Sequence, residues 1–279
     1  MKNMKLALLP MLLCLPFTMV GCGGTTETIT IGLECDYAPF NWTTYESSEY
    51  TLPISNKANA FADGYDIQIA KYLGQELNKE VKIVALPWDT LIPDLVMESI
   101  DLVIAGMTDT EERRQTISFT DEYYRSELVL ITSKTVADQY NSALNSDQLR
   151  SLINGKIIVS QKGTVTNDVI VNTFAKDYGA TAANPLESFA LAATDVSNGS
   201  AFAMTAELPV AQSIVANFTN LGIIHIDQAI LGEAQAELGV SIGLRKTDVE
   251  LQASINEALA KLTTDERVEI MAGALERSA

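Results

Sequence analysis

The sequence contains very little histidine and cysteine: His225 is the only histidine, and there are three cysteines among 279 residues. A Cys/His metal cluster needs several such side chains at set spacings, and a histidine-based catalytic triad needs a histidine beside a nucleophile. Cys14 and Cys22 both lie in or next to the apolar N-terminal run, which leaves Cys35 without a partner. We therefore expect no metal site, no cofactor and no disulfide framework.

Basic residues are also scarce, with 19 Lys and Arg against 36 Asp and Glu and a net charge of −17. Removal of the first residues would take away Lys2 and Lys5, leaving 17 basic residues against 36 acidic ones, a charge near −19. Binding to a nucleic-acid backbone requires a basic face, so the composition argues against a nucleic-acid partner. The same charge would hold the folded part away from an anionic membrane surface.

The N-terminus is typical of a secretory signal, which we place at residues 1–21. Lys2 and Lys5 precede an apolar run from Leu6 to Val20. The segment Met19-Val20-Gly21-Cys22 resembles the lipobox of bacterial lipoproteins, with methionine where leucine is usual. The resemblance implies cleavage before Cys22, a lipid on its sulfur and tethering to the membrane, with 22–27 as a lipidated linker. The alternative is an uncleaved anchor, although the run is short for a bilayer span.

The full sequence is 47% hydrophobic and long enough for one large domain or two ordinary ones. Its hydrophobic periodicity alternates between strand and helix, which predicts an α/β fold with open, mostly parallel sheets. The segment 43–62, rich in Ser, Asn, Thr and Tyr, is expected to be a loop or hairpin insert. We expect strands at 28–33, 81–86, 100–105, 128–132, 156–160, 201–205, 222–226 and 239–244, and helices at 65–77, 89–97, 147–153, 166–178, 188–197, 208–216, 248–262 and 265–275.

Arg113 is placed against its local electrostatics. The strand at 100–105 ends at Ala105-Gly106, and Thr110 is a good N-cap for the helical turn that follows. Arg113 then falls at the third helical position, where the positive end of the helix dipole disfavours a cation. This placement suggests an anion from outside, and a guanidinium clamps a carboxylate through two parallel bonds. The alternative is an exposed arginine paired with Glu111 or Glu112.

Taken together, a series of short motifs resembles the extracytoplasmic solute-binding proteins of polar amino acid ABC transporters, bacterial family 3. The motifs are Ile31-Gly32, Asp36-Tyr37-Ala38-Pro39-Phe40, Gly64-Tyr65-Asp66-Ile67, Trp88-Asp89-Thr90-Leu91-Ile92-Pro93-Asp94-Leu95, Ile104-Ala105-Gly106-Met107-Thr108 with Glu112-Arg113, Phe119-Thr120-Asp121-Glu122-Tyr123-Tyr124, Lys162-Gly163-Thr164, Gly199 and Glu207-Leu208-Pro209-Val210-Ala211.

The resemblance implies a two-lobed, type II periplasmic-binding-protein-like fold that closes on its ligand. It places the first crossing near 124–127 and the return near 237–241. The first lobe would then comprise 28–124 and 239–279, with 125–238 as the second lobe. It also implies a monomer that binds a free amino acid and delivers it to a transporter permease. We expect the protein outside the cytoplasm, anchored by lipid at the cell surface or in the periplasm.

The resemblance also assigns the groups that hold the two charged ends of the amino acid. Arg113 and the N–H of Thr108 would hold the α-carboxylate, together with backbone N–H groups at Gly163-Thr164-Val165-Thr166. The α-ammonium would contact the carbonyl of Gly106 in the segment Ala105-Gly106-Met107-Thr108, the Thr108 hydroxyl and Glu207, which stands where the family usually has aspartate. The alternative for Glu207 is an ordinary role at the start of the helix that begins at Leu208.

Three residues are expected to select the side chain of the ligand. The resemblance places Trp88 over that side chain, Tyr37 beneath it and Glu34 at its distal nitrogen. A carboxylate and an indole face both favour a cation, which predicts lysine or arginine. Histidine, glutamine or another polar amino acid remain the alternatives. We expect Cys35 and Asp36 to point elsewhere, because neighbouring residues of a strand alternate between its faces.

Two other functions share the fold that the resemblance implies. Cyclohexadienyl dehydratases are lyases with a similar sequence pattern, and such an enzyme could recruit Glu207 or Glu34 as a buried general acid. The fold also serves as the sensor domain of receptors. The amino-acid clamp and the lipobox favour transport, so we expect a binding protein and not an enzyme.

Overall fold

The computed structural model describes residues 27–279. The predicted signal peptide at 1–21, the predicted lipidation site Cys22 and nearly all of the predicted linker at 22–27 therefore lie outside the described residues. Among the described residues, no helix has both the length and the apolar character required to span a bilayer.

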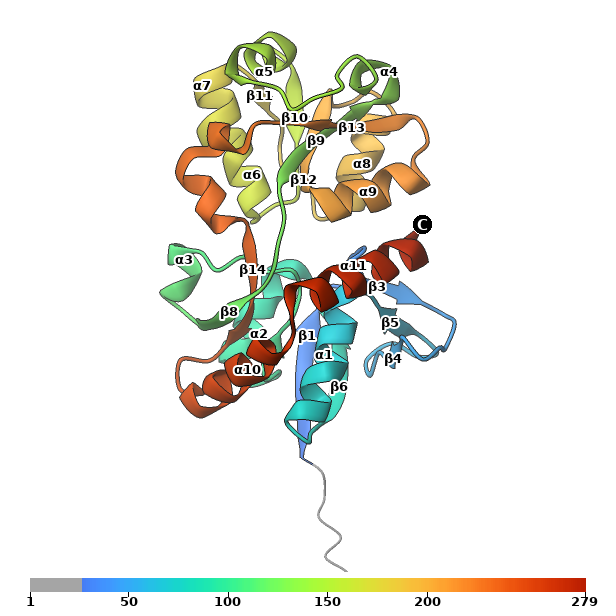
Figure 1. Cartoon of the computed structure of the whole chain (residues 1–279), viewed down its shortest axis with the longest axis vertical. Helices are drawn as coiled ribbons and strands as arrows, with labels where there is room; N and C mark the ends of the chain where they lie inside the picture. The colour runs from blue at the N-terminus through green and yellow to red at the C-terminus, as the bar shows by residue number, and fades with distance from the viewer. Residues whose placement is uncertain (1–26) are drawn as a thin grey trace, which may run out of the picture.

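Two α/β lobes lie one above the other, each built on a five-stranded sheet (Figure 1). Strands β8 (Ser118–Arg125) and β14 (Gly239–Leu244) approach the second lobe from the first and belong to the two connections between the lobes. The sheet of the first lobe has the order β6 (Glu80–Ala85), β1 (Thr28–Leu33), β7 (Leu102–Val103), β14 (Gly239–Leu244) and β8 (Ser118–Arg125). The sheet of the second lobe has the order β11 (Thr181–Ala182), β10 (Ile157–Val159), β12 (Ala203–Glu207), β9 (Leu128–Ser133) and β13 (Leu221–His225).

Both sheets are mixed, which corrects the expectation of mostly parallel sheets. Strand β1 pairs in parallel with β6 and β7, whereas β14 is antiparallel to both β7 and β8. In the second sheet, β10 is parallel to β11 and β12, and β9 is antiparallel to β12 and β13. The cause in the first sheet is the crossing: β8 runs toward the second lobe and β14 runs back, so the two lie antiparallel.

The predicted helices are present, with small shifts at their ends. The run predicted at 166–178 consists of three successive helical segments, α6 (Val165–Val169), η2 (Ile170–Ala175) and α7 (Lys176–Tyr178). Helices α5 (Ser146–Ile153) and α11 (Thr264–Ser278) begin with capping boxes at Asn145 and Thr263, which satisfy the first free N–H groups. The first lobe carries α1 (Tyr65–Glu76), η1 (Trp88–Thr90), α2 (Leu91–Val96), α3 (Glu111–Arg114), α10 (Val249–Lys261) and α11 (Thr264–Ser278). The second carries α4 (Lys134–Ala137), α5 (Ser146–Ile153), α6 (Val165–Val169), η2 (Ile170–Ala175), α7 (Lys176–Tyr178), α8 (Phe189–Ser197), α9 (Leu208–Asn217) and η3 (Gln228–Leu238).

The strand predicted at 100–105 is shorter than expected, since only Leu102–Val103 pairs as β7. The chain turns out of the sheet at Gly106, which has a φ of +58°. A Cβ at this position would come within 2.7 Å of the Tyr37 ring, so a larger residue would be strained here and would also clash. The result is a turn at 105–108 that brings Met107 and Thr108 to the space between the lobes.

The insert at 43–62 is more regular than the loop or hairpin expected from its composition. It contributes to a separate four-stranded sheet beside the first lobe, in the order β2 (Asp36–Tyr37), β3 (Asn41–Thr44), β5 (Phe61–Asp63) and β4 (Leu52–Pro53). Strand β3 pairs with β5, and β5 also pairs with β4, all antiparallel.

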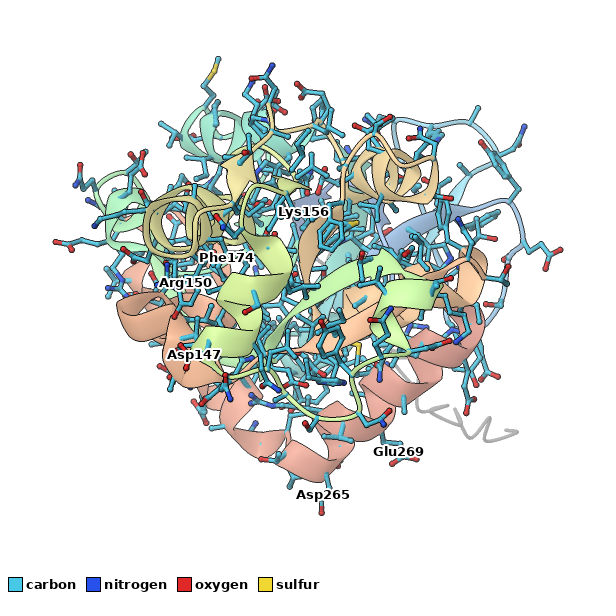
Figure 2. The ribbon with its side chains drawn as sticks, turned by 90° about the horizontal axis from the view of Figure 1, so that it is seen from above. Asp147, Arg150, Lys156, Phe174, Asp265 and Glu269 are labelled. Atoms are coloured by element: carbon cyan, nitrogen blue, oxygen red, sulfur yellow. The ribbon has the colours of Figure 1, made fainter. Side chains whose placement is uncertain are left out.

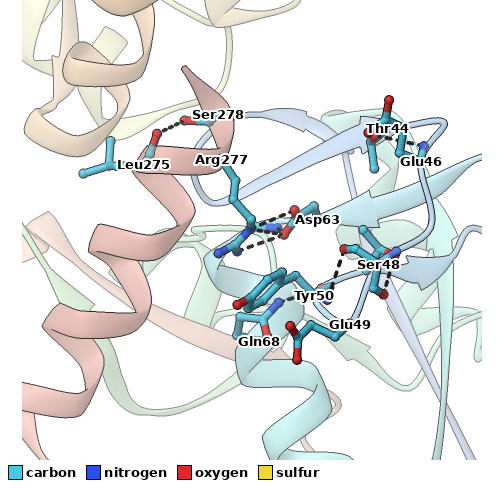
Figure 3. Close-up of polar contacts among 12 residues, drawn as sticks. Thr44, Glu46, Ser48, Glu49, Tyr50, Asp63, Gln68, Leu275, Arg277 and Ser278 are labelled. Carbon is cyan, nitrogen blue, oxygen red and sulfur yellow. Dashed lines mark hydrogen bonds and ion pairs between the residues drawn. The ribbon is translucent and has the colours of Figure 1, made fainter.

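The end of α11 fixes this small sheet to the rest of the molecule (Figure 3). Arg277 donates from Nε to Asp63 Oδ2 at 2.9 Å and from Nη2 to Asp63 Oδ1 at 3.0 Å. Its guanidinium also lies 4.2 Å from the centroid of the Tyr50 ring. One residue further, the Ser278 carbonyl accepts a hydrogen bond at 3.0 Å from Asn217 Nδ2, on α9 of the second lobe. The last turn of α11 therefore contacts the insert and both lobes.

Much of the acidic charge lies on the outside of the molecule. Seen from above the second lobe, Asp147 lies on α5, and Asp265 and Glu269 project outward from α11 (Figure 2). All three side chains are exposed, whereas Phe174 is fully buried in the core of the second lobe. Other carboxylates lie between the two lobes, where each lobe faces its neighbour.

Candidate ligand-binding site

Two connected cavities lie between the lobes. The inner cavity has a volume of about 20 Å³ and the outer one about 630 Å³, and they share Glu34, Trp88 and Arg113. The inner cavity is lined by Glu34, Tyr37, Trp88, Thr108 and Arg113 from the first lobe and by Gln161, Thr164, Val165, Phe189 and Glu207 from the second. Eight of the residues predicted from the sequence are therefore brought together around one small space.

Arg113 reaches this space from the short helix α3. Thr110 is the N-cap of α3, as predicted, and its hydroxyl accepts from the Arg113 N–H. The guanidinium turns back along its own lobe and donates from Nη1 to both the carbonyl and the hydroxyl of Thr108, each at 2.7 Å. These bonds hold Arg113 against the 105–108 turn, at the mouth of the inner cavity.

Arg113 and Trp88 both bond to the second lobe at Gly163. Arg113 Nη2 donates to the Gly163 carbonyl at 3.0 Å, and Trp88 Nε1 donates to the same oxygen at 3.1 Å. The guanidinium lies 5.3 Å from the centroid of the Trp88 ring, within the range of a cation–π contact. One carbonyl oxygen of the second lobe, that of Gly163, therefore accepts hydrogen bonds from a charged and a neutral side chain of the first lobe.

Glu207 ends strand β12 and stands at the N-cap of α9, but its side chain makes no capping bond. Its carboxylate instead accepts a hydrogen bond at 2.6 Å from the Tyr37 hydroxyl of the other lobe. Only 6% of Glu207 is exposed, and this burial raises its pKa above the ordinary value. The Tyr37 ring is held between Phe40 and Phe189, with centroids 5.2 and 5.0 Å away. The Glu207 side chain therefore lines the inner cavity and does not cap the helix that follows.

Glu34 lies at the junction of the two cavities and bonds to Gln161 of the second lobe. Gln161 Nε2 donates to Glu34 Oε1 at 2.8 Å. Burial raises the pKa of Glu34 to about 7, and the nearby charges of Asp36 and Asp89 act in the same direction, although the bond from Gln161 opposes them. This carboxyl group therefore takes up a proton more readily than an exposed glutamate does.

Asp36 corrects an expectation from the sequence. It lines the outer cavity together with Glu34, whereas it was expected to point elsewhere. Alternation reverses the side chain at each step, so it turns Cys35 away from Glu34 but returns Asp36, two positions further on, to the side of Glu34. Cys35 itself is buried, as a small apolar side chain in the core of the first lobe.

The 105–108 turn is held from behind by a buried carboxylate, Asp66. Its oxygens accept from Asn41 Nδ2 at 2.8 Å and from the Tyr123 hydroxyl at 2.7 Å. The Tyr123 hydroxyl in turn accepts at 3.0 Å from the Gly106 N–H. Complete burial raises the pKa of Asp66 to about 7, against lowering by these hydrogen bonds.

We expect this carboxyl group to make stability depend on pH. The ordinary pKa of 3.8 applies to the unfolded chain and about 7 to the folded one, so the folded protein binds more protons between these values. Its free energy of unfolding should therefore fall as pH rises through this range. Between pH 4 and pH 8, the free energy of unfolding of the wild-type protein, measured by urea denaturation, should fall by on the order of 3 kcal/mol relative to that of Asp66→Asn. Substitution of the exposed Asp147, Asp147→Asn, is the matched control. If the free energy of unfolding depends on pH equally in Asp66→Asn and wild type, the assignment is contradicted.

The other predicted residues occupy two kinds of position. Met107 and Gly163 line the outer cavity, and Thr164 and Val165 line the inner one. Ala105 and Thr166 are buried behind this lining, and the Thr166 oxygen lies 2.8 Å from both the Ser160 and the Thr164 hydroxyl oxygens. Gly106 likewise lies behind the lining, beneath Tyr37.

Several residues of the site were not expected from the sequence. Gln161 precedes the predicted Gly163–Thr166 segment by only two positions, and Phe189 lies in the first turn of the helix predicted at 188–197, but neither carried a signal of its own. The outer cavity adds Asp89, Glu187, Ser188 and Lys162. Within residues 27–279, no group of three or more His, Cys, Asp or Glu side chains is placed to hold a metal ion.

Two α/β lobes with a cavity between them define a periplasmic-binding-protein-like fold, and comparisons with known proteins agree. The model of the bacterial extracellular solute-binding proteins, family 3, matches residues 29–272. The chain belongs to this family.

Relatives and solved structures extend over nearly the whole chain. The histidine-binding periplasmic protein of Salmonella typhimurium strain LT2 is 26% identical over 278 residues, covering 98% of this chain and 96% of the relative. The lysine/arginine/ornithine-binding periplasmic protein of Escherichia coli K12 is 26% identical over 257 residues, covering 88% and 86%. The arginine-bound amino acid ABC transporter substrate-binding protein AbpA of Streptococcus pneumoniae has the same fold, with a TM-score of 0.72 at 23% identity, covering 90% of this chain and 95% of that protein. The predicted two-lobed fold is thereby confirmed.

Proposed function

We propose that this protein captures a free polar amino acid between its lobes and delivers it to an ABC transporter permease. The observation that carries the proposal is the convergence of Arg113 and Glu207 on one small space from opposite lobes. The two ends of a zwitterion need a cation and an anion to replace their hydration. Arg113 supplies the first and Glu207 the second, and the Thr108 hydroxyl and the backbone at 163–166 complete the two sites.

Cationic amino acids, lysine or arginine above all, are the proposed ligands. Glu34 places a carboxyl group where the cavities join, and Trp88 offers the face of an indole ring to a cation. Support comes from relatives named for binding histidine and for binding lysine, arginine and ornithine. Glutamine or another polar amino acid is the alternative within the same function.

Capture requires the lobes to separate and close again. In the structure, the Tyr37 hydroxyl donates a hydrogen bond to Glu207, and the Gln161 amide donates one to Glu34. The Gly163 carbonyl accepts hydrogen bonds from Arg113 and Trp88. An amino acid reaches Arg113 and Glu207 only when these cross-lobe contacts open, and it then replaces several of them with its own charged groups. We propose that the closed form is the one that docks onto the permease.

The remaining features of the proposal concern location and organisation. We propose export by the signal at 1–21, lipid anchoring through Cys22 and a monomeric state. The proposed lobes are 28–124 with 239–279, and 125–238. Mass spectrometry of the membrane fraction, comparing wild type with Cys22→Ser, tests the anchor.

The function is tested by a thermal-shift screen against the twenty amino acids, followed by calorimetry on those that stabilise the protein. Lysine or arginine should raise the melting temperature most, because binding to the folded state alone adds to its stability. Tenfold tighter binding of glutamine or another neutral amino acid would overturn the cationic assignment. Absence of binding by all twenty would overturn the function itself.

We further propose that the protein is not an enzyme. Its carboxyl groups in the cleft, the half-buried Glu34 and the buried Glu207, resemble the general acid that a cyclohexadienyl dehydratase-like lyase needs. In this structure, however, both are bonded to neutral side chains across the cleft, Gln161 and Tyr37. Incubation with prephenate and arogenate should give no turnover, and steady release of product would establish the lyase.

Trp88→Ala should weaken binding of the cationic ligand by about 1–3 kcal/mol, because the variant loses packing and cation–π contact. Titration calorimetry measures the change. Trp88→Phe, which keeps a flat ring but lacks the Nε1–H bond to Gly163, should recover part of the affinity. Equal loss in both variants would assign the effect to the Gly163 bond rather than to the ring face.

A further inference from the structure

Gln161 is a buried residue of the second lobe that faces the first. It lies just after strand β10, and only 1% of it is exposed. Its Nε2 donates to Glu34 Oε1 at 2.8 Å and to the Glu187 carbonyl at 3.0 Å. The second bond fixes the amide within its own lobe, so its orientation does not depend on the first lobe. Gln161 therefore presents a fixed N–H donor to Glu34 whenever the lobes close.

The surroundings of Glu34 make its charge sensitive to such a donor. Burial is the main influence and raises the pKa of Glu34 to about 7, while the bond from Gln161 is the main influence that lowers it. The cations that line the connected cavities are Arg113 and Lys162. Arg113 bonds to Thr108 and Gly163. The acids that line them are Asp36, Asp89, Glu187 and Glu207.

The two protonation states of Glu34 recognise different side chains. An ionised carboxylate is an acceptor only, and it suits the N–H groups of a guanidinium or ammonium. A protonated carboxyl group offers one donor and one acceptor, which matches the carbonyl and NH₂ of a neutral amide. Because its N–H stabilises the ionised carboxylate, Gln161 shifts the equilibrium of Glu34 toward the ionised state.

We propose that Gln161 and Glu34 form one specificity element, which selects a cationic side chain when Glu34 is ionised and a neutral amide side chain when Glu34 carries a proton. This inference rests on the proposed function, since it concerns the side chain of the same amino acid ligand. It makes Gln161 a specificity-determining residue that acts through Glu34.

The test measures dissociation constants for arginine and glutamine by calorimetry at half-unit steps from pH 5.5 to pH 8.5. For wild type, the ratio of arginine affinity to glutamine affinity should rise at least tenfold across this range, because one pKa unit corresponds to a tenfold change in the ionised fraction. Glu34→Gln, which cannot ionise, should give a ratio independent of pH. Gln161→Met, of similar length but without the donor, should shift the midpoint of the rise upward by about one pH unit, so that the ratio at pH 7 falls severalfold.

Gln139→Met, an exposed glutamine of the same lobe beyond α4, is the matched control and should follow wild type. Gln161→Glu, which keeps the length, is a second variant and should shift the midpoint upward as well, because two carboxyl groups then compete for one proton. A flat wild-type ratio, or a Gln161→Met midpoint equal to that of wild type, overturns the inference while leaving amino acid binding intact. Failure of wild type to bind either amino acid at any pH overturns the proposed function instead.

Discussion

Arg113→Ala is expected to reduce the affinity for the amino acid by at least about 100-fold, equivalent to roughly 3 kcal/mol. The reason is that truncation leaves the α-carboxylate desolvated between the lobes without its guanidinium partner. The Thr108 carbonyl and hydroxyl, which accept from Nη1 in the parent, lose their donor as well. Calorimetry with the best ligand of the thermal screen measures the loss.

Arg114→Ala is the control for this variant. Arg114 is the next residue of the same helix, is 58% exposed and pairs with Asp109 at 2.7 Å on the outside. Its removal should change affinity by less than twofold, since an exposed ion pair contributes little. If Arg113→Ala binds as tightly as Arg114→Ala, the carboxylate is held elsewhere and the assignment of the site is wrong.

Glu207→Gln is expected to have the second large effect, a loss of about 2–5 kcal/mol in binding. The substitution preserves the shape of the side chain and an acceptor for the Tyr37 hydroxyl, but it removes the negative charge opposite the α-ammonium. Because Glu207 is buried, no bulk water is available to compensate for that charge. A deaminated analogue of the ligand should bind wild type and Glu207→Gln almost equally, which separates the charge effect from a general disturbance of the cavity.

Glu127→Gln serves as the comparison for this second variant. Glu127 lies near the lobe crossing, is partly exposed and has its carboxylate 2.8 Å from His225 Nδ1. Its substitution should leave ligand affinity within about twofold. A binding loss for Glu127→Gln comparable to that for Glu207→Gln would mean that net charge, rather than direct contact, controls binding.

The sequence predicted those parts of the fold that depend on local pattern. The helix at 65–77 and the strand at 28–33 follow from periodicity, and the N-cap Thr110 follows from the residue type alone. Strand β8 was not expected, because the charged residues Asp121 and Glu122 near its middle interrupt the hydrophobic alternation, and the strand is held by its pairing with β14. The turn at Cys35 was missed for another reason: a positive φ at a non-glycine residue has no reliable sequence signal.

The site was predictable only as far as the family pattern reached. Arg113 was placed by its unusual position in a helical turn, and Glu207 by the resemblance. The bonds from Tyr37 to Glu207 and from Gln161 to Glu34 join residues 170 and 127 positions apart, so no local pattern could pair them. Whether Glu34 is charged depends on burial between two lobes, a property of the assembled molecule.

The last turn of α11 offers a way to observe motion in this protein. Asn217 donates to the Ser278 carbonyl across the gap between the lobes, while Arg277 holds the same turn to Asp63 on the other side. A hinge rotation must stretch the Asn217 bond, because the Arg277 ion pair moves with the first lobe. The fluorescence intensity of a solvent-sensitive fluorophore attached at position 217 would therefore change with each opening. Such a labelled protein would serve as a fluorescent sensor of nutrient concentration.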